Sequence, residues 1–199
     1  CARCQPGCKA AIGWSADLCS KVSTDGGRTF PSATFQVIAV NGSQPDLVYD
    51  RERKQAVLNF CHDRTGDWPK GGLNMQIQST DGVRWSAPRQ LPLSLGLRSA
   101  ESGPGIGLQL SHGSHAGRLL FSGWRSQTLG AMPGEVVWYS DDGGQTYHAA
   151  PSFPGGGAEA TMAENANGTV IIIFRINERG DQSTKGRLIA TSTDGGSSF

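Results

Sequence analysis

Short apolar runs, rich in β-branched and aliphatic residues, recur along most of the chain and are separated by glycine, proline, asparagine and aspartate. None of them continues with the three- and four-residue spacing of apolar positions that marks an amphipathic helix. Short runs between turn residues are typical of β-strands. The strands expected from this pattern span residues 45–50, 55–60, 73–79, 106–111, 117–124, 135–140, 168–175 and 186–192. The pattern therefore predicts an all-β fold.

Four turns share one sequence pattern, in which a serine, an aspartate and a glycine precede an aromatic residue. STDGGRTF occupies residues 23–30, SDDGGQTY residues 140–147 and STDGGSSF residues 192–199, while the shorter STDGVRW occupies residues 79–85. The central aspartates of these four aspartate turns are Asp25, Asp81, Asp142 and Asp194, separated by 56, 61 and 52 residues. This period lies in the range of propeller blades and solenoid repeats.

Each aspartate turn follows an apolar run directly, so we expect it to be a hairpin corner that leaves a strand. The aspartate should accept hydrogen bonds from backbone N–H groups of its own turn, the glycines should supply positive φ angles, and the aromatic residue should pack inward. Units of about four strands arranged radially form a β-propeller. A sandwich with four unrelated Asp-Gly hairpins is the alternative, and the near-equal spacing favours the propeller.

Composition and charge narrow the class of protein. The chain has 199 residues, of which 37% are hydrophobic, and a formal net charge of +1. This composition suits a globular protein with one large or two small domains. The balanced charge disfavours nucleic-acid-binding and membrane-surface proteins, and no apolar run is long enough to cross a membrane.

Four of the five cysteines crowd the start of the chain, at Cys1, Cys4, Cys8 and Cys19. Because no second pair of cysteine or histidine ligands follows at a metal-binding spacing, one or two disulfides are favoured over a zinc site, with Cys61 unpaired. Glycosylation sequons at residues 41–43 and 167–169 are compatible with an oxidising compartment. We therefore expect a secreted, extracellular or lumenal protein.

The aspartate turns resemble the Asp-boxes of the sialidase (neuraminidase) superfamily, although other propellers carry such boxes too. The segments between them are more specific. QPDLVYDRERKQAVLNF, SGPGIGLQLSHGSHAGRLLFSGW and GAEATMAENANGTVIIIFR resemble, in order and spacing, the corresponding stretches of exo-α-sialidases. The resemblance extends from Arg3 to Phe199. It implies a six-bladed β-propeller, of which residues 1–199 would form a single domain of about four blades, incomplete at both ends.

The resemblance implies catalytic roles for Glu159 and Arg175. Sialic acid carries a carboxylate on its anomeric carbon, which the planar fork of an arginine binds with two hydrogen bonds. Arg175 ends an apolar run and matches the second of three such arginines. Glu159 matches the glutamate that activates a tyrosine nucleophile in a retaining mechanism without a metal or an organic cofactor. The tyrosine and the other two arginines are expected outside this chain.

The acid/base aspartate is where the chain departs from the family pattern. Its expected position falls at Ile12 or Gly13, and neither residue can transfer a proton. Asp17 is the only carboxylate before the first aspartate turn and is a shifted candidate for this role. Five further residues match, or lie near, sugar-pocket positions of the family, namely Arg3, Gln44, Trp124, Glu101 and Trp68.

Two functions follow from these residues. The first is an exo-α-sialidase, a glycoside hydrolase that removes terminal sialic acids from glycoproteins, glycolipids or oligosaccharides, with this fragment alone expected to be inactive. The alternative is a non-catalytic Asp-box propeller that binds a glycan or a protein partner. Ile12, Gly13 and the short second turn favour this alternative. A propeller used only as a scaffold would make Glu159 and Arg175 incidental.

Overall fold

The computed structural model describes residues 17–62, 73–92, 100–103, 105–125, 134–151, 153–154, 157–176 and 186–199. In these residues the regular structure is β-strand, apart from two single 3-10 turns at Ser32–Thr34 and Gly113–His115. The predicted all-β fold is therefore confirmed. The described residues contain no helix that is long and apolar enough to cross a membrane.

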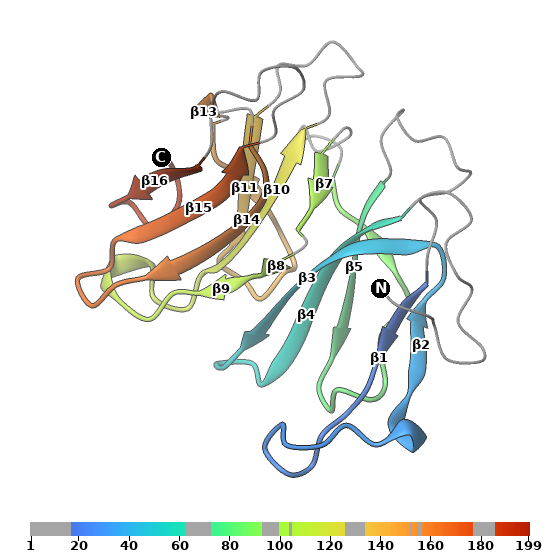
Figure 1. The fold of residues 1–199 in the computed structure, drawn as a ribbon. Helices are drawn as coiled ribbons and strands as arrows, with labels where there is room; N and C mark the ends of the chain where they lie inside the picture. Colours follow the sequence, from blue (N-terminus) through green and yellow to red (C-terminus); the bar gives the residue numbers. More distant parts are fainter. Residues whose placement is uncertain are drawn as a thin grey trace.

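The strands form four mostly antiparallel sheets (Figure 1). The first sheet pairs β1 (Leu18–Ser20) with β2 (Gln36–Ala39). The second sheet has the order β6-β5-β4-β3-β8. Its strands are β3 (Gly42–Asp50), β4 (Gln55–His62), β5 (Leu73–Ser79), β6 (Arg89–Gln90) and β8 (Gly105–Ile106), the last of which runs parallel to β3.

The third sheet is built around β10 (Leu119–Arg125) and β11 (Gly134–Ser140). Its shorter strands are β7 (Ala100–Ser102), β9 (Leu108–Gln109), β12 (His148–Ala149) and β13 (Phe153–Pro154). The fourth sheet has the order β14-β15-β16, with strands β14 (Gly157–Glu164), β15 (Val170–Ile176) and β16 (Arg187–Ser192).

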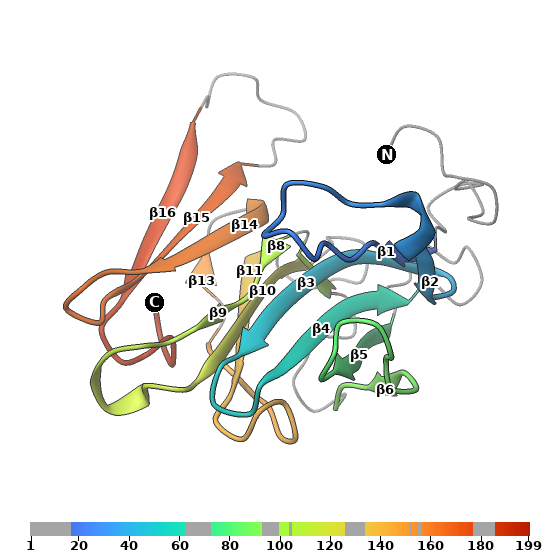
Figure 2. The same ribbon diagram turned by 90° about the horizontal axis from the view of Figure 1, so that it is seen from below.

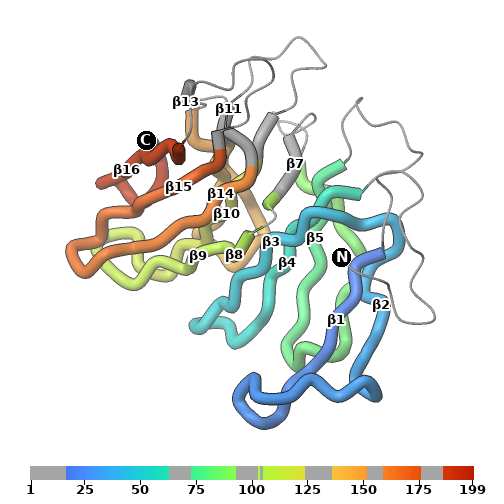
Figure 3. Tube along the Cα trace, viewed as in Figure 1, coloured from blue at the N-terminus to red at the C-terminus, as the bar shows by residue number. Residues whose placement is uncertain are grey.

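The sheets follow one another in chain order, in an arc from the blue first sheet to the red fourth sheet (Figures 1 and 2). The trace in Figure 3 shows the same succession. Among the described strands, no sheet closes on itself. One expected strand, residues 106–111, is instead divided between two sheets, because β8 pairs with β3 while β9 pairs with β10. Gly107 lies at the change of partner, where a Cβ atom would lie 3.0 Å from the Leu120 carbonyl oxygen.

Three buried apolar clusters fill the spaces between successive sheets. The first two sheets share the cluster Leu18, Ala39, Leu58, Phe60 and Ile77. The second and third sheets share the cluster Val48, Val57, Leu91, Leu119, Phe121, Val136, Trp138 and Tyr147. The third and fourth sheets share the cluster Leu110, Leu120, Val137, Ala150, Ala160, Met162, Val170, Ile172 and Phe174. Burial of these apolar faces is the main term that holds neighbouring sheets together.

The aspartate turns have the internal bonding that their sequence predicts. In the turn at 140–147, Asp142 Oδ1 accepts the backbone N–H groups of Gln145 at 2.9 Å and Thr146 at 2.8 Å. Gly143 and Gly144 have φ angles of 72° and 86°. Burial raises the pKa of Asp142, but hydrogen bonds from Thr146, Ser140 and Gln145 together outweigh it and lower the pKa to about 2. The carboxylate is therefore ionised across the physiological range.

Two of the aspartate turns also dock against the sheet that precedes them in the chain. The carbonyl oxygen of Gly143 accepts the side-chain amides of Gln55 at 3.1 Å and Gln78 at 2.9 Å, both from the second sheet. Likewise, Arg118, just before β10 of the third sheet, donates to the carbonyl oxygen of Gly195 at 3.1 Å. The turns are thus clamps between successive sheets.

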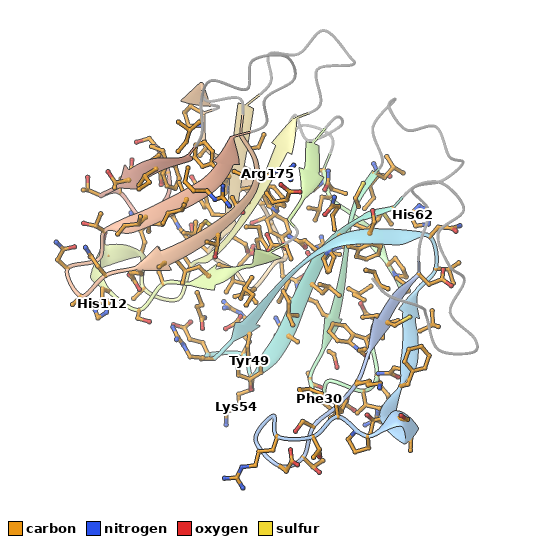
Figure 4. The ribbon with its side chains drawn as sticks, viewed as in Figure 1. Phe30, Tyr49, Lys54, His62, His112 and Arg175 are labelled. Carbon is orange, nitrogen blue, oxygen red and sulfur yellow. The ribbon has the colours of Figure 1, made fainter. Side chains whose placement is uncertain are left out.

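Three of the four aromatic residues that end the turns, Trp85, Tyr147 and Phe199, pack inward in agreement with this docking. Tyr147 is 6% exposed and its hydroxyl donates to Gln76 Oε1 of the second sheet at 2.7 Å. Trp85 and Phe199 are half-buried. The prediction of inward packing is wrong for Phe30, which is 53% exposed (Figure 4). Its turn follows β1 of the first sheet, and the described residues form no earlier sheet that could receive the ring.

One carboxyl group is buried at the boundary between the second and third sheets. Asp46 on β3 is 0% exposed, and its Oδ2 accepts the backbone N–H of Ser122 on β10 at 3.1 Å. Within the described part of the chain, its Oδ1 has no hydrogen-bond partner, and neither has the Nδ2 of its cross-strand neighbour Asn59. Burial raises the pKa of Asp46 to about 7, against the lowering effect of the Ser122 N–H.

Replacing Asp46 by asparagine should remove a pH dependence of stability. The unfolded carboxyl releases its proton near pH 3.8 and the folded one near pH 7, so the folded protein holds the extra proton between these values. The free energy of unfolding therefore falls as pH rises through this window, by at most about 4 kcal/mol. Urea denaturation of the full-length wild type and Asp46→Asn at pH 4.5 and pH 8 measures the effect.

As pH rises from 4.5 to 8, the free energy of unfolding of the wild type should fall relative to that of Asp46→Asn. Ser122→Ala is the matched control, because it keeps the backbone N–H that Asp46 accepts and should retain the wild-type pH dependence. An Asp46→Asn difference that is the same at both pH values would contradict the buried, late-ionising carboxyl.

Candidate functional site

Glu159 and Arg175, the two residues with the strongest predicted roles, are in direct contact. Arg175 Nε lies 2.7 Å from Glu159 Oε2, and the two side chains are 36% (Glu159) and 49% (Arg175) exposed. They come from neighbouring strands, β14 and β15. A half-exposed ion pair contributes little to stability. It does fix the orientation of a guanidinium whose side chain stays 49% exposed.

A β-bulge in β14 places Glu159 beside Arg175. The register pairs Ala160 with Phe174 and Gly157 with Ile176, so two residues of β14, Ala158 and Glu159, lie opposite the single residue Arg175. An extra residue bends a strand and redirects its side chains, and bulges are frequent beside active sites. The prediction from sequence missed this bulge. The glycine-rich run at residues 155–157 is the signal that indicates it.

The ion pair lies at the end of its sheet that is remote from the aspartate turn. Arg175 is near the end of β15, whereas Val170, at the start of β15, pairs with Ser192, the first residue of the turn at 192–199. Figure 4 shows Arg175 at the upper end of the sheets and Lys54 and Phe30 at the lower end. Phe30 closes the turn at 23–30.

The other candidates on described strands lie at the same ends of their sheets. Trp124 pairs with Glu101 at the end of β10 away from the pair formed by Leu119 and Ser140, where the third aspartate turn begins. Gln44 lies near the first residue of β3, which pairs with His62, and His62 is at the upper end in Figure 4. One rim of the sheets therefore carries these candidates, and the opposite rim carries the aspartate turns.

Gln44 has an unusual backbone. Its φ angle is +53°, within the irregular part of β3 between Ser43 and Asp46. A non-glycine residue in the left-handed region costs on the order of 1 kcal/mol, and such strain tends to persist at ligand sites. Gln44 is half-buried, and its role in binding the sugar stays a prediction, which this backbone strain supports.

Asp17 has a visible structural contact. Its Oδ1 accepts the backbone N–H of Asn41 at 3.0 Å, which ties the start of β1 to the turn between β2 and β3. Its role as an acid stays a prediction. Arg3, Trp68, Ile12 and Gly13 lie outside the described residues. The described residues contain no group of three or more histidine, cysteine, aspartate or glutamate side chains arranged to hold a metal ion.

Comparison with known proteins gives independent evidence on the family of this chain. Residues 40–199 match the family described as BNR repeat-like domain. A sialidase from Micromonospora viridifaciens is 31% identical to the chain, over 89% of the chain and 30% of that protein. The chain therefore spans less than a third of the length of this relative.

Solved structures with the same fold include sialidases and trans-sialidases. A Hadza microbial sialidase superposes with a TM-score of 0.72 at 20% identity, over 94% of this chain and 40% of that one. The leech intramolecular trans-sialidase superposes with a TM-score of 0.72 at 17% identity, over 96% of this chain and 46% of that one. The intramolecular trans-sialidase from Ruminococcus gnavus superposes with a TM-score of 0.71 at 16% identity, over 92% of this chain and 63% of that one.

Proposed function

Because the chain belongs to the BNR repeat-like family, within the sialidase superfamily, we propose that it is part of an exo-α-sialidase that removes terminal sialic acids from glycoconjugates. The observation that carries the proposal is the 2.7 Å contact between Glu159 and Arg175 on the rim away from the aspartate turns. We also propose that the four sheets are blades of a six-bladed propeller and that the aspartate turns are its Asp-boxes. A secreted or lumenal location fits substrates on glycoconjugates.

Arg175 binds the substrate in this proposal. The carboxylate on the anomeric carbon of sialic acid is held by the guanidinium, whose fork matches the two carboxylate oxygens. The contact with Glu159 Oε2 uses Nε, so the terminal nitrogens Nη1 and Nη2 are available for the sugar. Gln44, Trp124, Glu101, Arg3 and Trp68 are the proposed lining of the sugar pocket.

Glu159 acts as the base for a tyrosine that lies outside this chain. A permanently negative nucleophile would be repelled by the carboxylate of the substrate. A tyrosine is neutral until a neighbouring carboxylate takes its proton, so it can approach the anomeric carbon. Attack by tyrosine and then by water inverts the anomeric centre twice, and the product retains its configuration. Asp17 is the remaining candidate for the acid that protonates the leaving group.

The test is turnover of a fluorogenic sialoside by the full-length protein, with the configuration of the first released sugar followed by NMR. Release of the α-anomer supports the retaining sialidase. A non-catalytic, glycan-binding propeller is the second candidate, because Ile12 and Gly13 occupy the expected position of the acid. Binding of the sialoside without any turnover would support that candidate and contradict the hydrolase.

A further inference from the structure

A second arginine lies beside the ion pair. Arg187 on β16 is the direct cross-strand partner of Arg175 on β15. The side chains of directly opposite residues point to the same face of a sheet, with Cβ atoms about 4.5–5.5 Å apart. Both arginines are exposed. Like charges in this position destabilise a sheet, so structural stability does not account for the pair.

The row of charges across the fourth sheet is not balanced. Glu159 on β14, Arg175 on β15 and Arg187 on β16 follow one another, and the only carboxylate among them pairs with Arg175. Arg187 forms no ion pair with any described residue, and its Nη1 donates to the carbonyl oxygen of Gly186 at 3.2 Å. Among the residues that the structure describes, one positive charge in the row therefore has no anionic partner.

The described neighbours of this row on the same face carry no negative charge. The next cross-strand pair on the same face is Ile173 and Ile189, which are 37% and 64% exposed. The third pair on this face is Ile171 and Thr191. An unpaired guanidinium at the edge of an apolar surface fits a ligand that brings an anionic group next to a hydrophobic or sugar face.

We infer that Arg187 binds a second anionic group of the substrate, next to the carboxylate that Arg175 binds. The inference rests on the proposed function and names the substrate class, which is sialosides whose neighbouring sugar also carries an anionic group. Neighbouring strands are about 4.8 Å apart, so two long arginine side chains reach anionic groups on adjacent sugars. Either a second carboxylate, as in two linked sialic acids, or a sulfate ester supplies this chemistry.

The experiment compares three substrates with the full-length wild type, Arg187→Gln and Arg187→Lys. The first substrate is a sialoside on a neutral galactose, the second a disialoside, and the third a sialoside on a sulfated galactose. Arg187→Gln should raise KM about 10-fold for the disialoside, the sulfated substrate or both, because one charge-assisted contact is lost. Its KM for the neutral-galactose substrate and its kcat should change less than about twofold. Arg187→Lys should recover part of the loss because it keeps the charge.

The two doubly anionic substrates distinguish a carboxylate from a sulfate as the natural group. Thermal melting curves of the variants confirm that they are folded. An equal rise of KM for all three substrates, or no rise for any, would overturn the inference. If the wild type cleaves none of them, the proposed hydrolase activity is wrong. The role of Arg187 is then tested by calorimetric binding of the three intact glycans to the wild type and to Arg187→Gln. Weaker binding by Arg187→Gln of a doubly anionic glycan, but not of the neutral-galactose glycan, would support the inference, and equal changes for all three would overturn it.

Discussion

Replacing Arg175 by alanine in the full-length protein should lower kcat/KM for a terminal sialoside by about 100- to 1,000-fold. The change removes the charge-assisted hydrogen bonds to the substrate carboxylate and leaves Glu159 without its 2.7 Å partner. Losing one member of such a charged set costs about 3–4 kcal/mol in binding or transition-state free energy. Steady-state kinetics with a fluorogenic sialoside measures the effect.

Two companion variants show which property of Arg175 matters. Arg175→Lys keeps the charge but not the planar fork, so it should recover only part of the activity. Glu159→Gln should lower kcat strongly with little change in KM, because an amide cannot take the proton of the tyrosine while it leaves the carboxylate clamp in place. Near wild-type kinetics for Arg175→Ala would exclude Arg175 from the site.

Replacing Arg118 by methionine should lower the free energy of unfolding by about 3 kcal/mol. The Arg118 side chain is 6% exposed, with Nε 2.7 Å from Asp141 Oδ1 and its guanidinium carbon 4.0 Å from the centroid of the Tyr139 ring. Its Nη1 also donates to the Gly195 carbonyl oxygen at 3.1 Å and to Ser197 Oγ at 2.8 Å. Methionine fills similar space but makes none of these contacts.

The measurement for Arg118 is chemical denaturation of the full-length protein. Arg84→Ala is the matched control, because Arg84 also contacts an aspartate of an aspartate turn, at 2.8 Å from Asp81, but its side chain is 90% exposed. Exposed ion pairs contribute little, so this variant should unfold like the wild type. Equal stability of Arg118→Met and Arg84→Ala would contradict the view that Arg118 joins the third sheet to the turn at 192–199.

The aspartate turns were predictable because their bonding is local. Asp25 accepts the N–H groups of Arg28 and Thr29, three and four residues further on, and in each turn the aspartate bonds lie within its own seven or eight residues. The strand of Arg175 was predictable for the same reason, since an apolar run between two turns has few alternatives. Assigning a role to Arg175 needed the family resemblance, because a charged residue at a strand end is also common on ordinary surfaces.

Contacts between distant parts of the chain were not predictable. Arg118 meets Gly195 across 77 residues, and Asp46 meets Ser122 across 76, so only the arrangement of the sheets brings them together. The sequence did not indicate a binding role for Arg187, because that role depends on the strand register that places it opposite Arg175. Phe30 looked like the other turn aromatics, and its exposure depends on what lies beside the first sheet.

The most direct test of the central claim is a crystal structure of the full-length protein with a non-hydrolysable sialic acid analogue. The account predicts that the carboxylate of the analogue lies about 3 Å from the Arg175 guanidinium, with Glu159 at hydrogen-bond distance from a tyrosine hydroxyl, on the rim opposite the aspartate turns. An analogue bound elsewhere, with Arg175 and Glu159 not touching it or a tyrosine, would contradict the account.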